Sequence, residues 1–191
     1  MIKKLELKIP NMIYMHSFLE NINDYKTNDD LEYFNMYKAA INNFEQYVNK
    51  LNNNAKGLDL PEGYIPSSTF WLVNDDNNVL GVVRIRHQAI PLHGHIGYDI
   101  APRYRGNGYG NKILELALPL AKKLGINQVI LNCESTNIRS QKVIQLNNGI
   151  LFKTIVGDGK VYNQILLLKY KYIYMFLYIK IFYNKIFHYN F

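Results

Sequence analysis

Cysteine is nearly absent from this sequence, which contains Cys133 and no other. A chain with one cysteine cannot form an internal disulfide framework or a cysteine-rich metal site. An apolar run is also missing from the first residues, Met1 to Glu6, so the start does not resemble a secretion signal. These absences predict a cytoplasmic protein.

Acidic residues are absent after Asp158. The net charge is +7, but four of the positive charges come from Lys169, Lys171, Lys180 and Lys185. Residues 1–168 therefore carry only +3, and they contain no basic stripe with interleaved aromatic residues. This pattern disfavours a nucleic-acid partner, and a modest positive excess also suits a ligand that carries phosphates.

The 191 residues predict one domain over residues 1–168, followed by a low-complexity tail of aromatic residues and lysine over residues 169–191. Within residues 170–191, all residues but Met175 and His188 can be encoded by A and T alone. This break in composition indicates read-through or a frameshift. A membrane anchor is the alternative, but lysines interrupt the tail, and a spanning helix needs about 20 predominantly apolar residues.

Hydrophobic periodicity predicts the elements of the N-terminal part. Residues 3–9 alternate like a half-buried strand, and apolar residues recur every three or four positions from Leu31 to Leu51. The second pattern predicts one long amphipathic helix that ends near residues 52–54. Its aromatic stripe fits a buried core, with a substrate pocket as the alternative.

The rest of the chain predicts an α+β domain. We expect a hairpin of residues 69–73 and 79–87, a strand at 95–101, a helix at 113–124 that Pro119 kinks or loosens, a strand at 128–132, a helix at 137–146 and a final hairpin of 150–156 and 161–168. The crossover between the strands at 95–101 and 128–132 predicts that these two are parallel, in a mixed sheet.

A glycine-rich segment, Arg105-Gly-Asn-Gly108-Tyr-Gly110, lies between a predicted strand and a predicted helix. Glycines at this place let the backbone approach a phosphate closely, and a helix N-terminus adds free N–H donors. The segment predicts a site for a pyrophosphate-sized anion, and a turn that serves packing alone is the alternative. A dinucleotide-binding fold is disfavoured, because the spacing is Gly-x-Gly-x-Gly and the preceding strands are predicted to be antiparallel.

This segment resembles the Arg/Gln-x-x-Gly-x-Gly/Ala motif of the GNAT superfamily of N-acetyltransferases. Residues 61–73, 81–87 and 94–98 are also similar to a bacterial subgroup described as predicted acetyltransferases, and the similarity covers roughly residues 28–168. The resemblance implies the GNAT fold, with a mixed, mostly antiparallel sheet of six to seven strands and flanking helices. It also implies acetyl-CoA as cosubstrate, no metal, and direct acetyl transfer to a primary amine of a small molecule or peptide.

The resemblance further implies a set of cofactor-binding residues. A backbone N–H near Ile100 or Ala101 is expected to bond the thioester oxygen. Asn137 and Ser140 are expected to bind the cofactor, with Asn137 bonding the pantetheine arm. The alternative role of Asn137 is only to cap the helix that follows it. The pyrophosphate is expected to meet the amides of Arg105, Gly106, Asn107, Gly108, Tyr109, Gly110 and Asn111.

Proton transfer is the open part of the prediction. Many GNAT relatives have a tyrosine seven residues after the asparagine, and this chain has Ile144 there. Candidate catalytic residues are Glu134, His87 and Tyr98, each with a structural role as its alternative. Because of Ile144, a catalytically impaired CoA-binding regulatory module is the alternative function, and a membrane-associated protein that uses its tail is a third class.

The remaining reactive side chains fit structural roles better. His93 and His95 lie two apart without an acidic partner at ligand spacing, so they resemble a metal site only superficially. Cys133 could act as a nucleophile, but it has no neighbouring base in the sequence and is predicted to be a small buried residue. A homodimer is compatible with the sequence.

Overall fold

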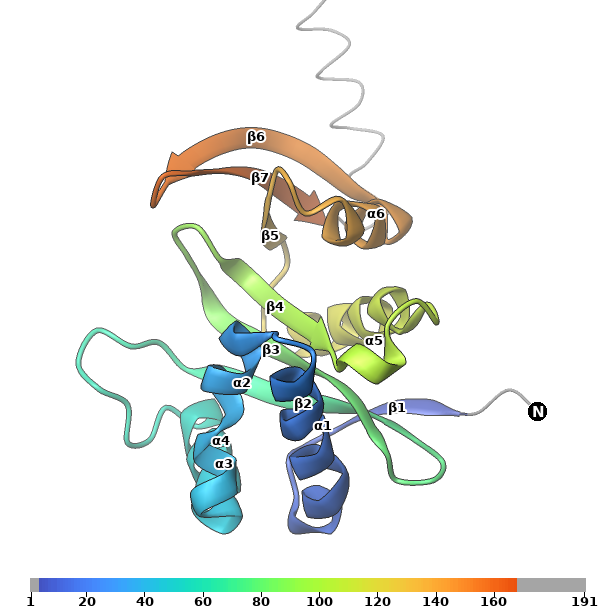
Figure 1. Cartoon of the computed structure of the whole chain (residues 1–191). Coiled ribbons are helices and arrows are strands. Elements are labelled where there is room, and N and C mark those ends of the chain that lie inside the picture. Colours follow the sequence, from blue (N-terminus) through green and yellow to red (C-terminus); the bar gives the residue numbers. More distant parts are fainter. Residues whose placement is uncertain (1–3, 168–191) are drawn as a thin grey trace, which may run out of the picture.

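The computed structural model describes residues 4–167, which form a seven-stranded sheet with helices on both faces (Figure 1). The strand order is β1-β2-β3-β4-β5-β7-β6. The strands are β1 Leu5–Lys8, β2 Ser67–Asn74, β3 Val79–Ile90, β4 Gly94–Ile100, β5 Val129–Glu134, β6 Gly149–Gly157 and β7 Lys160–Leu167. The α+β class and all seven predicted strands are confirmed. The predicted tail, residues 169–191, lies outside the described residues.

The prediction of a parallel crossover pair was wrong. β4 and β5 share a single residue pair, Gly94 with Leu131, and it is antiparallel, as are all the other pairings of the described strands. A Cβ on Gly94 would lie 2.4 Å from the carbonyl oxygen of Ile130, so only glycine permits this approach. Because the strands pair nowhere else, no ladder forms, and a gap opens between the rest of β4 and β5.

The N-terminal helices differ from the prediction. The single helix predicted from Leu31 is three helices, α2 Leu31–Tyr37, α3 Ala39–Asn42 and α4 Phe44–Ala55. Asn43 breaks the pattern: it is extended, with φ −154° and ψ 97°, and its side chain accepts a hydrogen bond from the Gln46 N–H at 2.9 Å. Asparagine side chains compete with the helix in this way, and periodicity does not reveal it. The prediction also missed α1, Met15–Thr27.

Two hydrophobic cores lie on opposite faces of the sheet. Helices α1 to α4 cover β2 and β3 on one face, where Phe18 stacks on Trp71 with ring centroids 4.5 Å apart (Figure 1). Tyr37 and Phe44 of the predicted aromatic stripe are buried there, so the core interpretation of the stripe is confirmed. Helices α5, Tyr109–Lys123, and α6, Ile138–Leu146, contribute to the other core.

Helix α5 continues through Pro119 to Lys123, so the predicted loosening of its last turns does not occur. Proline removes the hydrogen bond to the carbonyl four residues earlier. That carbonyl belongs to Glu115, which is exposed like Pro119, and water can therefore satisfy it.

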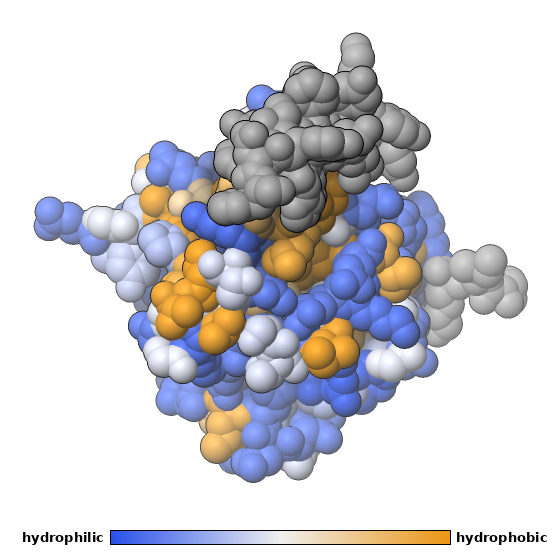
Figure 2. Space-filling view, turned by 90° about the horizontal axis from the view of Figure 1, so that it is seen from above, coloured by the Kyte–Doolittle hydropathy of each residue, from blue (hydrophilic) through white to orange (hydrophobic). Residues whose placement is uncertain are grey.

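The β6 end of the sheet exposes apolar side chains. Figure 2 looks at the molecule from above and shows apolar patches separated by polar residues. Leu151, Phe152 and Val156 of β6 are exposed by 53%, 55% and 76%. No helix formed by residues 4–167 is long and apolar enough to cross a membrane.

Candidate active site

The glycine-rich loop between β4 and α5 forms an open cradle. Gly106 and Gly108 have φ angles of 82° and 80°, in the left-handed region that favours glycine. A Cβ on either residue would meet no atom within 4 Å, so the space in front of both is empty. Gly108 directly precedes α5, and the N–H groups of Tyr109 and Gly110 at its start lack partners within the helix. The Asn111 and Arg105 N–H groups donate to the carbonyls of Gly108 and Pro102 at 3.0 and 3.1 Å, so they are not free for the pyrophosphate as we predicted. The cradle therefore offers several backbone donors to an anion.

The other residues of this segment are placed by local contacts. Asn107 shapes the loop by donating to the carbonyl oxygens of Tyr104 and Arg105 at 3.1 and 3.2 Å. Asn111 accepts from Asn147 at 2.8 Å, which ties α5 to α6. Gly110 lets the two helices pack closely, because a Cβ there would lie 3.3 Å from Val143.

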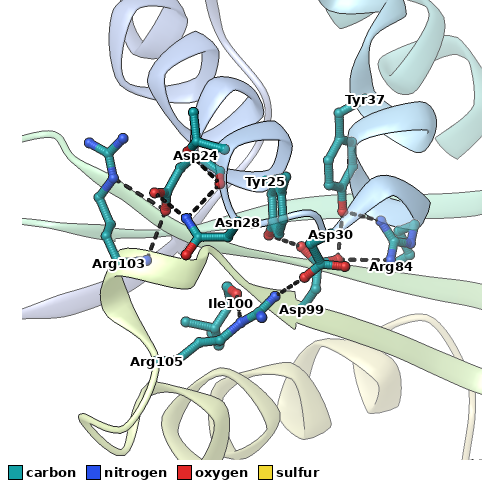
Figure 3. Close-up of polar contacts among 11 residues, drawn as sticks. Asp24, Tyr25, Asn28, Asp30, Tyr37, Arg84, Asp99, Ile100, Arg103 and Arg105 are labelled. Atoms are coloured by element: carbon teal, nitrogen blue, oxygen red, sulfur yellow. Dashed lines mark hydrogen bonds and ion pairs between the residues drawn. The ribbon is translucent and has the colours of Figure 1, made fainter.

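Arg105 is held by the protein itself (Figure 3). Its Nε donates to the carbonyl of Ile100 at 2.9 Å, and its Nη2 pairs with Asp30 at 2.5 Å. Its guanidinium carbon lies 5.9 Å from the ring centre of Tyr25. Arg105 thus joins the cradle to the turn between α1 and α2, and its contact with a phosphate stays a prediction.

Backbone donors of β4 point into the gap beside β5. The Ala101 N–H donates to the Leu80 carbonyl at 3.0 Å, toward β3, so it is not free to bond a thioester as we predicted. N–H groups of an antiparallel strand alternate in direction, and Ile100 therefore points its N–H to the side of β5. Since β4 and β5 pair only at Gly94 and Leu131, the Ile100 N–H fits the predicted role.

Three predicted residues meet between β4 and α6. The Asn137 side chain caps α6 by accepting from the Ser140 N–H at 3.0 Å, and the Ser140 hydroxyl lies 3.1 Å from the Tyr98 hydroxyl. Burial raises the pKa of Tyr98 to about 12, and Cys133 adds to this while the Ser140 hydrogen bond opposes it. Tyr98 therefore keeps its proton at neutral pH. Cofactor contacts of Asn137 and Ser140 stay predictions.

Glu134 is the last residue of β5, where it pairs with Tyr162 of β7. It pairs with Lys160 of β7 at 2.6 Å, and its side chain is 38% exposed. The hydrogen bond and charge of Glu134 raise the pKa of Lys160, to which Glu32 of α2 adds a smaller effect. The carboxylate is thus accessible, and it lies beside β7.

His87 is not brought to Glu134 or Tyr98 by any contact within residues 4–167. Its Nε2 lies 2.9 Å from the Ser68 hydroxyl, and its backbone N–H donates to the Pro66 carbonyl. Both contacts lead toward β2, which is the neighbour of β3 on the side away from β4.

Ile144, at the position of the family tyrosine, is fully buried in the core. Its Cγ2 packs against Gly149, where a Cβ would lie only 2.4 Å away. Burial also raises the pKa of the Cys133 thiol, which disfavours a nucleophilic thiolate. Within residues 4–167 no group of three or more His, Cys, Asp or Glu side chains could hold a metal ion.

A buried polar cluster near the cradle was missed by the sequence analysis (Figure 3). Asp99 of β4 accepts from the hydroxyls of Tyr25 and Tyr37 at 2.6 and 2.5 Å and pairs with Arg84 at 3.0 Å. Burial raises the pKa of both tyrosines, and the Asp99 charge adds to it. The cluster fixes α1 and α2 to β3 and β4. A charged residue in each of two apolar strands was the available signal.

Beside the cradle, a second group of charges links the same elements. Asp24 of α1 accepts from the backbone N–H of Arg103 at 2.8 Å and pairs with its side chain at 3.3 Å. With the pair of Arg105 and Asp30, both arginines around the start of the loop are tied to α1 or to the turn after it (Figure 3).

His95 replaces part of the missing ladder between β4 and β5. Its Nδ1 accepts from the backbone N–H of Ile130 at 3.0 Å, which requires an unprotonated Nδ1. Burial lowers the pKa of His95, and the nearby charge of Arg86 lowers it further.

This hydrogen bond predicts a pH-dependent stability. The unfolded chain binds the proton near its ordinary pKa of about 6.5, above the lowered folded value, so stability is present above that pH and falls below it. Between pH 7 and pH 5 the melting temperature should fall more for the natural protein than for His95→Asn, whose Oδ1 can still accept the bond. The exposed His93 provides the control, because His93→Asn should keep the natural pH dependence. Equal slopes for all three proteins would contradict the prediction.

The chain belongs to the acetyltransferase (GNAT) family, whose model matches residues 29–149. No curated protein sequence matches the chain. The protein is therefore an acetyl-CoA-dependent acetyltransferase.

Solved structures share this fold at low sequence identity. The ribosomal L7/L12 α-N-protein acetyltransferase RimL in complex with CoA is 16% identical, with a TM-score of 0.64 over 86% of this chain and 93% of that one. The microcin C7 self-immunity acetyltransferase MccE, in complex with acetyl-CoA and AMP, is 15% identical, with a TM-score of 0.61 over 87% and 93%. A spermidine/spermine N-acetyltransferase from Vibrio cholerae is 16% identical, with a TM-score of 0.54 over 90% and 99%.

Proposed function

We propose that the protein transfers the acetyl group of acetyl-CoA to a primary amine of a small molecule or peptide by direct attack. The observation that carries the proposal is that the glycine cradle and an unpaired backbone N–H lie close together in the sequence, at the end of β4. The cradle of Gly106 and Gly108 presents backbone donors at the start of α5, and the Ile100 N–H faces the gap beside β5. The first fits a pyrophosphate, and the second fits a thioester oxygen.

The residues around the gap support one assignment of roles. Ile100 would stabilise the negative charge that develops on the thioester oxygen while the amine nitrogen attacks the carbonyl carbon. Glu134 would take the proton of the amine, since it ends β5 and its carboxylate is 38% exposed. Tyr98 keeps its proton at neutral pH and would give it to the sulfur when the C–S bond breaks.

Two observations support Tyr98 as the acid, and a second candidate for the base remains. The position of the family tyrosine is occupied by the buried Ile144, which has no proton to give. Tyr98 of β4 instead brings a hydroxyl to α6, where it contacts Ser140. A thiol has an ordinary pKa of about 8.5, so departure of an unprotonated thiolate is also tolerable. His87, whose ring contacts Ser68, is the second candidate base.

Thiol release during incubation with acetyl-CoA and a panel of amines tests the proposal. The panel should contain peptides with free N-termini and polyamines, because solved neighbours are named for a ribosomal protein and for spermidine or spermine. We expect release that depends on an amine and a stoichiometric N-acetyl product. CoA binding without release across the whole panel would favour the regulatory module. A cytoplasmic location and a homodimer stay predictions.

A further inference from the structure

The end of β4 presents a carbonyl oxygen as well as an N–H to the side of β5. The N–H and the C=O of one residue in a strand point in the same direction. Ile100 lies opposite Gly81 of β3, and the next N–H, that of Ala101, donates to the carbonyl of Leu80. Both polar groups of Ile100 therefore point away from β3. The carbonyl oxygen thus places a partial negative charge beside the N–H that fits the thioester oxygen.

The side chain of Arg105 satisfies this carbonyl (Figure 3). Its Nε donates to the Ile100 oxygen at 2.9 Å, across five residues of the chain. The 3₁₀ turn Pro102–Tyr104 makes this contact possible, because it turns the chain back at the end of the strand. The Arg105 N–H closes the turn by donating to the Pro102 carbonyl at 3.1 Å.

The other contacts of Arg105 hold its guanidinium at the end of β4. Nη2 pairs with Asp30 at 2.5 Å, and the guanidinium carbon lies 5.9 Å from the ring centre of Tyr25. The Tyr25 hydroxyl donates at 2.6 Å to Asp99, the residue before Ile100 in β4. The Arg105 side chain is 36% exposed. Helix α1 and the turn after it therefore fix this cation beside Ile100.

We infer that Arg105 is a positioning residue for acetyl transfer. Its hydrogen bond to the Ile100 carbonyl fixes the backbone of Ile100 at the end of β4, and it masks the carbonyl oxygen from the negative charge that develops on the thioester oxygen. This inference rests on the proposed function. A donor that is oriented before the reaction stabilises an oxyanion strongly, whereas an unmasked carbonyl oxygen beside it would repel the same charge. Arg105 is therefore expected to act on turnover and not on CoA affinity.

A direct contact of Arg105 with a phosphate predicts the opposite result. Such a contact depends on the charge of the guanidinium, and its loss weakens CoA binding. The hydrogen bond to Ile100 needs only an N–H at the position of Nε. Glutamine carries its amide nitrogen at the same number of bonds from Cα, whereas methionine has a similar length and no donor. The two substitutions therefore separate the hydrogen bond from the charge.

Arg105→Met should lower kcat by about tenfold or more, a part of the 10² to 10³-fold cost of removing an oxyanion donor itself. Arg105→Gln should retain most of the natural kcat, because its amide can still donate to Ile100. Calorimetric titration should give similar CoA affinities for both variants and the natural protein. Equal losses of kcat in the two variants, or a natural kcat in folded Arg105→Met, would overturn the inference. Weakened CoA binding with an unchanged kcat would assign Arg105 to the phosphates instead.

Two control variants test whether Arg105 only ties the loop to α1 and the turn after it. Asp30→Asn removes the ion pair of Arg105 and leaves the hydrogen bond to Ile100 in place. Arg103→Met removes an arginine two residues earlier that pairs with Asp24 of α1 at 3.3 Å. Both should keep the natural kcat, even where the melting temperature falls. Losses of kcat equal to that of Arg105→Met would reduce Arg105 to a structural tie and overturn the inference.

The carbonyl stretching frequency of bound acetyl-CoA provides a measurement that needs no acceptor. A hydrogen bond to the thioester oxygen lowers this frequency, which infrared difference spectroscopy with an isotope-labelled carbonyl can detect. We expect a lowered frequency in the natural protein and in Arg105→Gln, and a return toward the value of free acetyl-CoA in Arg105→Met. An equal frequency in all three proteins would overturn the inference. A frequency that depends on Arg105, without thiol release for any amine, would count against the proposed function alone.

Discussion

Replacing Gly108 with valine is expected to weaken CoA binding about 100-fold or more, equivalent to about 2.7 kcal/mol, while the protein remains folded. Gly108 has a φ of 80° and directly precedes α5. A valine side chain would occupy the empty space in front of the cradle, and it would also pull the backbone away from the left-handed region. Both effects keep a pyrophosphate from the N–H groups at the helix start. Calorimetric titration with CoA measures the loss.

Gly63 offers a closely matched control for this substitution. Its φ is 79°, and a Cβ there would also meet no atom within 4 Å, but it lies in the loop before β2. Gly63→Val therefore introduces the same backbone strain without entering the cradle. We expect similar losses in melting temperature for the two variants and normal CoA affinity for Gly63→Val. Normal affinity in a folded Gly108→Val protein would remove the basis for placing the phosphates here.

Local sequence patterns predicted most of the strands, because the alternation of apolar residues and the turn residues both lie within short segments of the chain. The broken helix at Asn43 shows the limit of periodicity, since a side chain that caps the next helix leaves the apolar spacing unchanged. The single contact of β4 with β5 shows another limit. The pairing depends on a close approach at Gly94, and crossover rules describe only the general direction of such strands.

The candidate site also contains parts that the sequence predicted and parts that it did not. The cradle was predictable because its glycines and the following helix are adjacent in the sequence. The Asp99 cluster was not, because Tyr25 lies 74 residues away along the chain and joins it only through the packing of α1 on the sheet. The buried Arg86 Nη1 without a hydrogen-bond partner was not predictable either, because only the three-dimensional structure shows which neighbours surround it.

Glu134→Gln is expected to lower kcat by about 10² to 10⁴-fold, the range for loss of a positioned general base. The amide preserves the size of the side chain at the end of β5 but cannot accept a proton. Since Glu134 is exposed and lies outside the cradle, CoA affinity and melting temperature should change little. Steady-state kinetics with a saturating amine measure kcat directly, and a parallel CoA titration verifies that the cradle is unaffected.

Lys160→Gln distinguishes a catalytic carboxylate from a structural ion pair. It removes the partner of Glu134 at 2.6 Å and leaves the carboxylate in place. If Glu134 is the base, Lys160→Gln should retain most of the activity that Glu134→Gln loses, whereas a structural ion pair predicts equal losses for both. His87→Gln should then have the smaller effect, because its ring is turned toward Ser68. A larger loss in His87→Gln, with the acidic limb of the pH–rate profile shifted or absent, would transfer the role of base to His87.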